Sequence, residues 1–407
     1  MDSLATTIAD DFAEACFAFQ QGRLREAADT FARIVAADGT HAESVRHLGL
    51  IAHRIGNHAQ AAELISQSIL LNPHSAQAFA DLVQPLRMLG QHQSARKARR
   101  TAAAMGHAAD DTSDESPLMV PEPWRHVHLV VVEPDNYPHA AGLMDFMTGL
   151  AHAFAELGCD AEIVRNRFST QSMNLVFGAH LITSADIARG MPANSVIVNL
   201  EQLRGSGFEQ QPVYLDLLGR LPVWDYSPRN IAALKALTGN PRVVHMGIGY
   251  AAPMTRLPAV ENHPTDVLFY GSLNDRRRAV LRALEQAGMR VRYLFGIYGP
   301  ERDKAIAEAK VVLNMHFYEA GIHELVRTSH LLANAKAVVS ECNADTEIDD
   351  DIRRAMLTVP YDQLADTCIA LARDDARRLH VEQTGFAIFV RRSQWAMLAR
   401  AIAATGP

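Results

Sequence analysis

The stretch 311–341 carries polar residues that could bind an anion, and its pattern predicts a strand, a loop, a helix and a second strand. Asn314 and His316 follow the first apolar run, where a parallel strand would end. Glu324 and Arg327 lie in the first turns of the predicted helix, near the positive end of its dipole. Ligands of an open α/β sheet bind outside the carboxyl ends of the strands, and a helix N-terminus there favours phosphate. We therefore predict a diphosphate site with Arg327 as its cation.

The helix in this stretch is expected to begin near residues 321–323. Leu325, Ser329, Leu332 and Ala333 recur at helical spacing, which predicts one apolar or small face. A simpler role for Arg327 is an ion pair with the Glu three residues before it, which this spacing allows. The sequence alone leaves both roles open.

A second anion-binding element is expected after the apolar strand 266–270. Gly271 and Ser272 form a small-residue turn there, ahead of Asn274 and a run of arginines that begins at Arg276. The backbone N–H groups of such a turn can bind phosphate oxygens, and Arg276 or its neighbour could add charge. The alternative is an ordinary tight turn followed by a solvated arginine face.

A general base could come from four side chains of the preceding region, one of which is Asp225 in the strand predicted at 223–226. Asp135 and His139 are expected on the loop after the strand that begins near His126, and Glu201 follows the apolar run 196–200. An inverting group transfer needs such a base next to the acceptor hydroxyl, and imidazole titrates in a suitable range. A retaining enzyme would not need one.

Three histidines within fifteen residues raise the question of a metal. His316, His323 and His330 are spaced by seven, but His316 is expected before the helix and no Cys or fourth ligand joins them. The acidic run 349–351 is typical of a solvated segment or a helix start. We expect no metal site and no cofactor.

The composition excludes several classes of protein. The 407 residues are 48% hydrophobic and 21% charged, which indicates two or three globular domains, and a net charge of −7 gives no case for nucleic-acid binding. The four cysteines are far apart and form no CxxC pair, as expected in a reducing compartment. With no signal peptide and no membrane-spanning run recognised, we expect a cytoplasmic protein.

Residues 5–107 repeat with a period of 34. The glycines Gly22, Gly56 and Gly90 share this interval, and so do the alanines Ala27, Ala61 and Ala95. Glycine permits the turn between two helices and alanine lets helices pack closely. A 34-residue period with these features resembles the tetratricopeptide repeat, with about three units, the first having a weak first helix. Such a stack could bind a peptide or protein, or serve packing and self-association.

The rest of the chain reads as two successive α/β regions. Residues 108–125 are acidic and proline-rich, which predicts a linker. Regions 126–250 and 262–405 each open with a strand, a loop and a helix, and further strands are expected, including one at 181–182. The predicted fold class is a helical repeat unit followed by two Rossmann-like halves.

The run Arg327-x-x-His330 followed by LANAKAVV at 332–339 resembles the nucleotide-sugar site of GT-B glycosyltransferases, in particular the CgeB-like proteins. That family shows R-x-x-E and then L-A-x-G-x-x-V. His330 stands at the position of the family's Glu, which is expected to bind ribose hydroxyls, and Ala335 stands at the position of its Gly. The first departure leaves the identity of the donor open.

The resemblance implies a GT-B fold in which residues 262–405 bind the donor, residues 126–250 face the acceptor, and the last helix crosses back to the first half. The expected donor-binding residues are Gly271, Ser272, Asn274, Arg276, Tyr298, Asn314, His316, His323, Glu324, Arg327, His330 and Glu341. The implied activity is metal-independent transfer of a hexose from a nucleotide sugar.

Repeats beside such an enzyme suggest a protein acceptor, by analogy of layout with protein glycosylation systems. One alternative is a scaffold whose GT-B region has lost catalysis, as the His330 and Ala335 departures would allow. Others are a glycosyltransferase acting on a surface polysaccharide, with the repeats used for homo-oligomer assembly, and a nucleotide-sugar epimerase.

Overall fold

The computed structural model describes residues 2–89, 91–107, 120–135, 137–203, 207, 210–258, 260, 262–317 and 321–406, and it divides into two compact units, Met1–Ser116 and Pro117–Pro407. Gly90, one of the three repeated glycines, lies outside the described residues. So do residues 108–119, which make up most of the predicted linker. Each unit is considered by itself.

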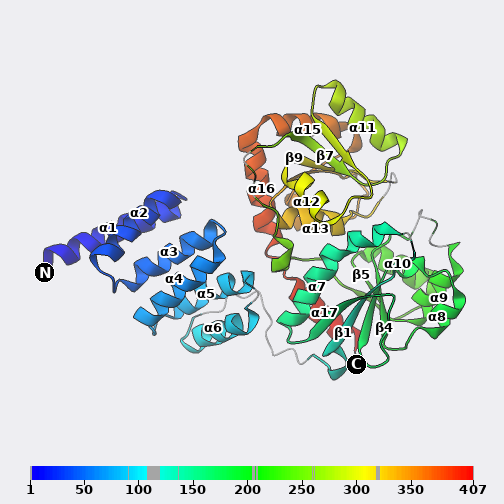
Figure 1. Cartoon of the computed structure of the whole chain (residues 1–407), viewed down its shortest axis with the longest axis horizontal. Helices are drawn as coiled ribbons and strands as arrows, with labels where there is room; N and C mark the ends of the chain where they lie inside the picture. The colour runs from blue at the N-terminus through cyan, green and yellow to red at the C-terminus, as the bar shows by residue number, and fades with distance from the viewer. Residues whose placement is uncertain are drawn as a thin grey trace. The chain divides into compact units, whose positions relative to one another are not determined.

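The first unit consists of helical hairpins (Figure 1). Gly22 and Gly56 adopt positive φ angles of 76° and 85° between paired helices, a conformation that glycine reaches without steric cost. Ala27, Ala61 and Ala95 are all buried at helix contacts. The first helix is a full 19 residues long, so the expectation of a weak first helix was wrong. The described helices are α1 (Asp2–Gln20), α2 (Leu24–Ala37), α3 (Ala42–Arg54), α4 (His58–Leu71), α5 (Ala76–Met88) and α6 (His92–Ala104).

The second unit begins with a parallel sheet whose described strands run in the order β2-β1-β3-β4-β5-β6. These strands are β1 (His126–Val131), β2 (Asp160–Arg165), β3 (Met173–Phe177), β4 (Ser195–Asn199), β5 (Val223–Asp225) and β6 (Val243–His245). The helices are α7 (Met144–Glu156), α8 (Ala185–Gly190), α9 (Pro212–Arg220) and α10 (Pro228–Thr238), with 3-10 helices η1 (Glu122–Trp124), η2 (Pro138–Leu143), η3 (Ala179–Leu181) and η5 (Ala252–Met254). The strand predicted at 181–182 is wrong, because η3 takes its place.

The second half of this unit is another parallel sheet, with its described strands in the order β11-β10-β9-β7-β8. They are β7 (Thr265–Tyr270), β8 (Val291–Leu294), β9 (Ala309–Asn314), β10 (Ala337–Glu341) and β11 (Leu357–Val359). The helices are α11 (Asp275–Gln286), α12 (Gly299–Ala307), α13 (Leu325–Ala333), α14 (Asp350–Arg354), α15 (Leu364–Arg373), α16 (Asp375–Phe389) and α17 (Gln394–Thr405), with the 3-10 helix η6 (Tyr361–Gln363). Helix α13 begins at Leu325, slightly later than expected, and the face predicted as apolar or small is buried.

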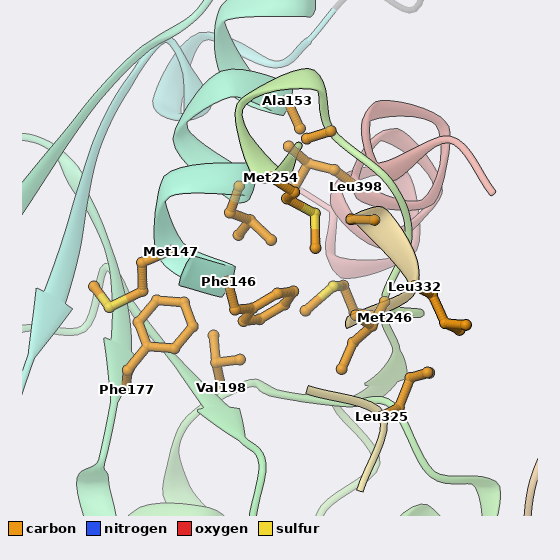
Figure 2. Packing of buried hydrophobic residues seen from close by; sticks show 14 of the residues in the cluster. Phe146, Met147, Ala153, Phe177, Val198, Met246, Met254, Leu325, Leu332 and Leu398 are labelled. Atoms are coloured by element: carbon orange, nitrogen blue, oxygen red, sulfur yellow. The ribbon is translucent and has the colours of Figure 1, made fainter. Parts of the chain in front are cut away.

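One hydrophobic core joins the two halves. Figure 2 shows Phe146 of α7 within the cluster, Met147 beside Phe177, and Met254, with Leu325 and Leu332 of α13 and Leu398 of α17, in the same cluster. Burial of this shared apolar surface favours a fixed arrangement of the two sheets.

The last helix crosses back to the first half, as the resemblance implied. Helix α17 packs against α7 (Figure 1). Trp224 of β5 donates from Nε1 to Thr405 Oγ1 at 2.7 Å, and its ring stacks on Trp124 at 5.2 Å between centroids. The predicted fold class, helical repeats followed by a GT-B double Rossmann-like region, is confirmed. Among the described residues, no helix is both long and apolar enough to span a bilayer.

Candidate functional site

A cavity of about 590 Å³ lies between the two halves, at the carboxyl ends of strands from both sheets. Strand neighbours β1/β3 and β7/β9 are the points where strand order reverses, and ligands of such sheets bind there. The volume falls in the range of small-molecule sites. Its walls are formed by Tyr137, His139, Gly142, Leu143, Asp145, Leu200, Glu201, Gln202, Tyr226, Tyr270, Gly271, Ser272, Leu294, Phe295, Gly296, Ile297, Tyr298, Arg302, His316, Phe317, Ile322, Glu324, Val326, Arg327 and His330.

Arg327 projects from the first turn of α13 to the cavity wall. Its Nη2 lies 2.8 Å from Glu324 Oε2, and its Nη1 donates to Asn314 Oδ1 at 3.2 Å. Asn314 is fixed in turn by its own bond to Ser340 Oγ at 3.0 Å, from the register-matched position of β10. The ion pair with Glu324 therefore exists, and the guanidinium still faces the cavity. A diphosphate would compete with Glu324 for this cation.

The turn after β7 brings backbone close to Arg327. Gly271 has a φ of 137°, and a Cβ at this position would lie only 3.2 Å from Arg327 Nη2. Glycine thus leaves room for the guanidinium beside the turn. Ser272 also lines the cavity, and its carbonyl accepts from Arg277 Nη1 at 2.8 Å. The predicted pairing of this turn with Arg327 is brought about by the fold.

Sequence reasoning missed a charged cluster that joins the two halves at the cavity. Arg302 of α12 lies 2.7 Å from Asp145 of α7 and 2.7 Å from Asp303. Burial alone would raise the pKa of Asp145, but His330, Arg302 and Arg256 outweigh it and lower that pKa. The partners come from helices about 150 residues apart in the chain, and no local motif marks them. The acidic first turn of α7 was the one available signal.

His330, at the position of the family's Glu, points into this cluster. Its Nε2 lies 3.2 Å from Asp303 Oδ1, and it also lines the cavity. Ala335, at the position of the family's Gly, has a φ of 49°. It thus keeps a left-handed backbone that glycine would adopt at lower cost.

Several predicted donor-binding residues lie away from the cavity wall. Glu341 is fully buried and forms an ion pair with Arg276, whose guanidinium stacks over the Tyr361 ring at 3.9 Å. Asn274 caps α11 by accepting from Arg277 N at 2.9 Å. His323 is buried with Nε2 2.8 Å from Thr328 Oγ1, and burial lowers its pKa to about 3. We assign these residues structural roles, and Asn314 acts behind Arg327.

Replacing Arg276 by Met tests this structural role. The substitution leaves the buried Glu341 carboxylate without its cation, so we expect the free energy of unfolding to fall by about 3 kcal/mol. Chemical unfolding followed by tryptophan fluorescence suits the measurement, because all three tryptophans lie in the second unit. Arg278→Met is the matched control, since Arg278 is exposed on the same helix. Equal stability of the two variants would contradict the assignment.

The opposite wall carries the carboxyl group of Glu201, just after β4. Burial, and then the charge of Glu324, raise its pKa to about 7. His180 Nδ1 lies 3.8 Å from Glu201 Oε1, and burial lowers the pKa of that histidine to about 4. A carboxyl group with this pKa exchanges protons readily at neutral pH. Of the four predicted bases, Asp135 is exposed and Asp225 is fully buried, and both lie outside the cavity wall.

His139, the remaining candidate base, belongs to an aromatic edge of the cavity. Its Nδ1 lies 2.6 Å from Tyr298 Oη, across the two halves. Tyr137 and Phe295 pack around the His139 ring at 5.2 and 5.4 Å between centroids. Aromatic side chains with flat apolar faces and polar tips can pack against a nucleobase or a sugar ring of the substrate. His316, two residues after the end of β9, lines the cavity, and burial lowers its pKa, which favours the neutral ring.

Within the part of the chain that the structure describes, no three His, Cys, Asp or Glu side chains gather as metal ligands would. Of the three histidines of 316–330, His330 contacts Asp303, whereas His323 contacts Thr328 and lies within electrostatic reach of His316.

Comparisons with known proteins found similar sequences and similar structures. No protein-family model matches the chain. An uncharacterized protein of Acanthamoeba polyphaga mimivirus is 29% identical over 189 residues, covering 43% of this chain and 58% of the relative. A second one is 27% identical over 181 residues, covering 42% of this chain and 24% of the relative. The chain thus spans less than two thirds of the length of either relative.

Two solved structures resemble the chain at low identity. A mutant O-GlcNAc transferase from Thermobaculum terrenum is 15% identical, covers 99% of this chain and 98% of its own, and gives a TM-score of 0.41. HepE from Anabaena, solved with UDP and glucose, is 13% identical, covers 69% of this chain and 99% of its own, and gives a TM-score of 0.48.

Proposed function

We propose that this protein is a glycosyltransferase that moves a sugar from a nucleotide-sugar donor to an acceptor hydroxyl. The observation that carries the proposal is the division of the cavity wall. Arg327 supplies a cation beside the Gly271–Ser272 turn on one side, and the partly exposed carboxyl group of Glu201 faces it from the other half. Sugar transfer needs a group that binds the donor diphosphate and a group that takes the acceptor proton, both within reach of one bound donor.

The donor diphosphate binds at Arg327, which releases Glu324. The guanidinium can hold two phosphate oxygens and stabilises the negative charge that develops as the bond from the anomeric carbon to the diphosphate breaks. Gly271 and Ser272 bring backbone against the phosphates, and Tyr298, His316 and His330 contact the rest of the donor.

Glu201 is the general base of an inverting transfer. Its carboxylate takes the proton of the acceptor hydroxyl, and the acceptor oxygen forms its new bond to the anomeric carbon as the nucleoside diphosphate leaves. Because its pKa is about 7, the ionised form is available at neutral pH and still basic enough to accept a proton. His139 serves binding at the aromatic edge rather than proton transfer.

The acceptor is a protein or peptide recruited by the helical unit, whose 34-residue hairpins suit peptide binding. Arg327 supplies the charge that a metal provides in other transferases, so the reaction runs without one.

Donor consumption tests the proposal. A mixture of UDP-, GDP-, dTDP- and CMP-linked sugars is incubated with the protein, and loss of each donor is followed by mass spectrometry. We expect slow consumption of one donor through hydrolysis even without acceptor, at the same rate in EDTA. Tight binding of a nucleotide without consumption of its sugar conjugates would favour a binding protein that has lost catalysis. The contact of His330 with Asp303 would then be a feature of that binding site.

A further inference from the structure

The short loop that carries Glu201 is held by two buried asparagines. Asn199 is the last residue of β4, and Asn230 lies in the first turn of α10; both are at most 2% exposed. The Glu201 carbonyl accepts from Asn230 Nδ2 at 2.8 Å and from Asn199 Nδ2 at 3.0 Å. The Glu201 N–H donates to Asn199 Oδ1 at 3.2 Å. Both backbone polar groups of Glu201 are thus bonded to side chains.

Each asparagine is itself fixed by a second set of bonds. Asn199 Nδ2 donates to Asp225 Oδ2 at 2.6 Å, and Tyr214 donates its hydroxyl to Asn199 Oδ1 at 2.6 Å. The same two strand positions, Asn199 and Asp225, are paired in the sheet register. Asn230 Oδ1 accepts from Leu203 N at 3.3 Å. A buried network whose members are bonded in this way is rigid.

We propose that Asn199 and Asn230 are positioning residues that hold the Glu201 carboxyl group at the acceptor side of the cavity. The inference rests on the proposed role of Glu201. Residues 200–203 belong to no helix or strand, so β4 and α10 orient this loop through the two amides. A general base must stay within hydrogen-bond reach of the acceptor hydroxyl, and a misplacement of about 1 Å can cost about 100-fold in rate.

Asn240 provides a matched control in the same half. It is also 2% exposed, donates to Leu218 O at 2.6 Å and Leu221 O at 2.7 Å, and accepts from Arg242 N at 2.9 Å. Its side chain thus makes three bonds, against four for Asn199, and these three partners lie outside the Glu201 loop. Replacement of the Asn230 amide or of the Asn240 amide by a carboxyl group should therefore disturb folding to a similar extent.

The test compares Asn230→Asp with Asn240→Asp in the full chain, using the sugar nucleotide that the wild type consumes. Asn230→Asp replaces the donor that faces the Glu201 carbonyl with an oxygen. We expect the rate to fall about 10- to 100-fold with the donor Kd unchanged. We also expect the rising limb of the rate against pH to move to higher pH, because the new carboxylate disfavours ionisation of Glu201. The groups already facing Glu201 are His180, Glu324, Tyr137, Tyr214 and Tyr226, and Asp225, whose pKa burial raises to about 7, bonds to both asparagines behind it.

Asn230→Ala removes the amide without adding charge and keeps the test valid if the Asp variant fails to fold. It should slow donor consumption at unchanged donor Kd, and Asn240→Asp should leave both the rate and the pH profile at wild-type values. If the rates and pH profiles of all three variants equalled one another, the positioning role would be overturned while the proposed function stayed intact. Absence of donor consumption by the wild type would instead overturn the proposed function, and this inference with it.

Discussion

Glu201→Gln is expected to lower the rate of donor consumption about 100- to 10,000-fold, the usual contribution of a positioned general base. Glutamine keeps the shape of the side chain but cannot take a proton. The donor Kd should stay at its wild-type value, because the residue lies on the wall opposite Arg327. Steady-state rates and calorimetric binding on the same preparations separate the two effects.

The dependence of the rate on pH gives a second test of Glu201 as the general base. The base acts when ionised, so the wild-type rate should rise with pH through about pH 7, the value to which burial and Glu324 raise the pKa of Glu201. That rising limb should be absent from Glu201→Gln. Asp135→Asn is the control, since Asp135 is exposed and outside the cavity wall. If Asp135→Asn lowered the rate of donor consumption and Glu201→Gln did not, Asp135 rather than Glu201 would be the general base.

Arg327→Ala is expected to weaken nucleoside diphosphate binding about 100-fold, because a bound diphosphate would lose its charged partner within the cavity. Glu324, which now pairs with Arg327, would remain beside the phosphates and add repulsion. Arg327→Lys keeps the charge but loses the fork that holds two oxygens, so an intermediate affinity is expected. Arg278→Ala, an exposed arginine of α11, should bind like the wild type.

If Arg327→Ala binds a nucleotide as tightly as Arg278→Ala does, the diphosphate does not lie at Arg327. The ion pair with Glu324 would then be the whole role of this arginine, as the spacing of the two residues also allowed.

Local patterns in the sequence predicted the frame of this site. Apolar runs followed by polar residues marked the strand ends that meet at the cavity, and the turn at Gly271 was recognised from its small residues. These features depend on neighbours in the chain, so periodicity and residue type suffice to find them. The 34-residue spacing of Gly22 and Gly56 likewise located the hairpin turns of the first unit.

Which charged side chain faces the cavity could not be read from the sequence. Arg276 and Arg277 are adjacent, yet Arg276 is directed to Glu341, 65 residues away, and Arg277 donates to the carbonyl of Met315. Asp145 and Arg302 meet only because the two halves pack together. Such partners are set by the tertiary fold, and local composition carries no information about them.

The amides around Glu201 were missed for a related reason. Asn199 and Asn230 look like an ordinary strand end and helix start, and their function depends on the side-by-side placement of β4 and β5. The missing signal is the pairing of a buried amide with the backbone of the loop that carries Glu201, which only the folded chain shows.

The central claim is that the cavity binds a nucleoside diphosphate, and calorimetric titration of the wild type with UDP, GDP, dTDP and CMP tests it most directly. We predict saturable, roughly micromolar binding of one of the three diphosphates, with a 1:1 stoichiometry, as is common for enzyme substrates, and no comparable binding of the monophosphate CMP. Absence of binding by all three diphosphates would contradict the account and leave the double-sheet unit without a diphosphate-dependent role.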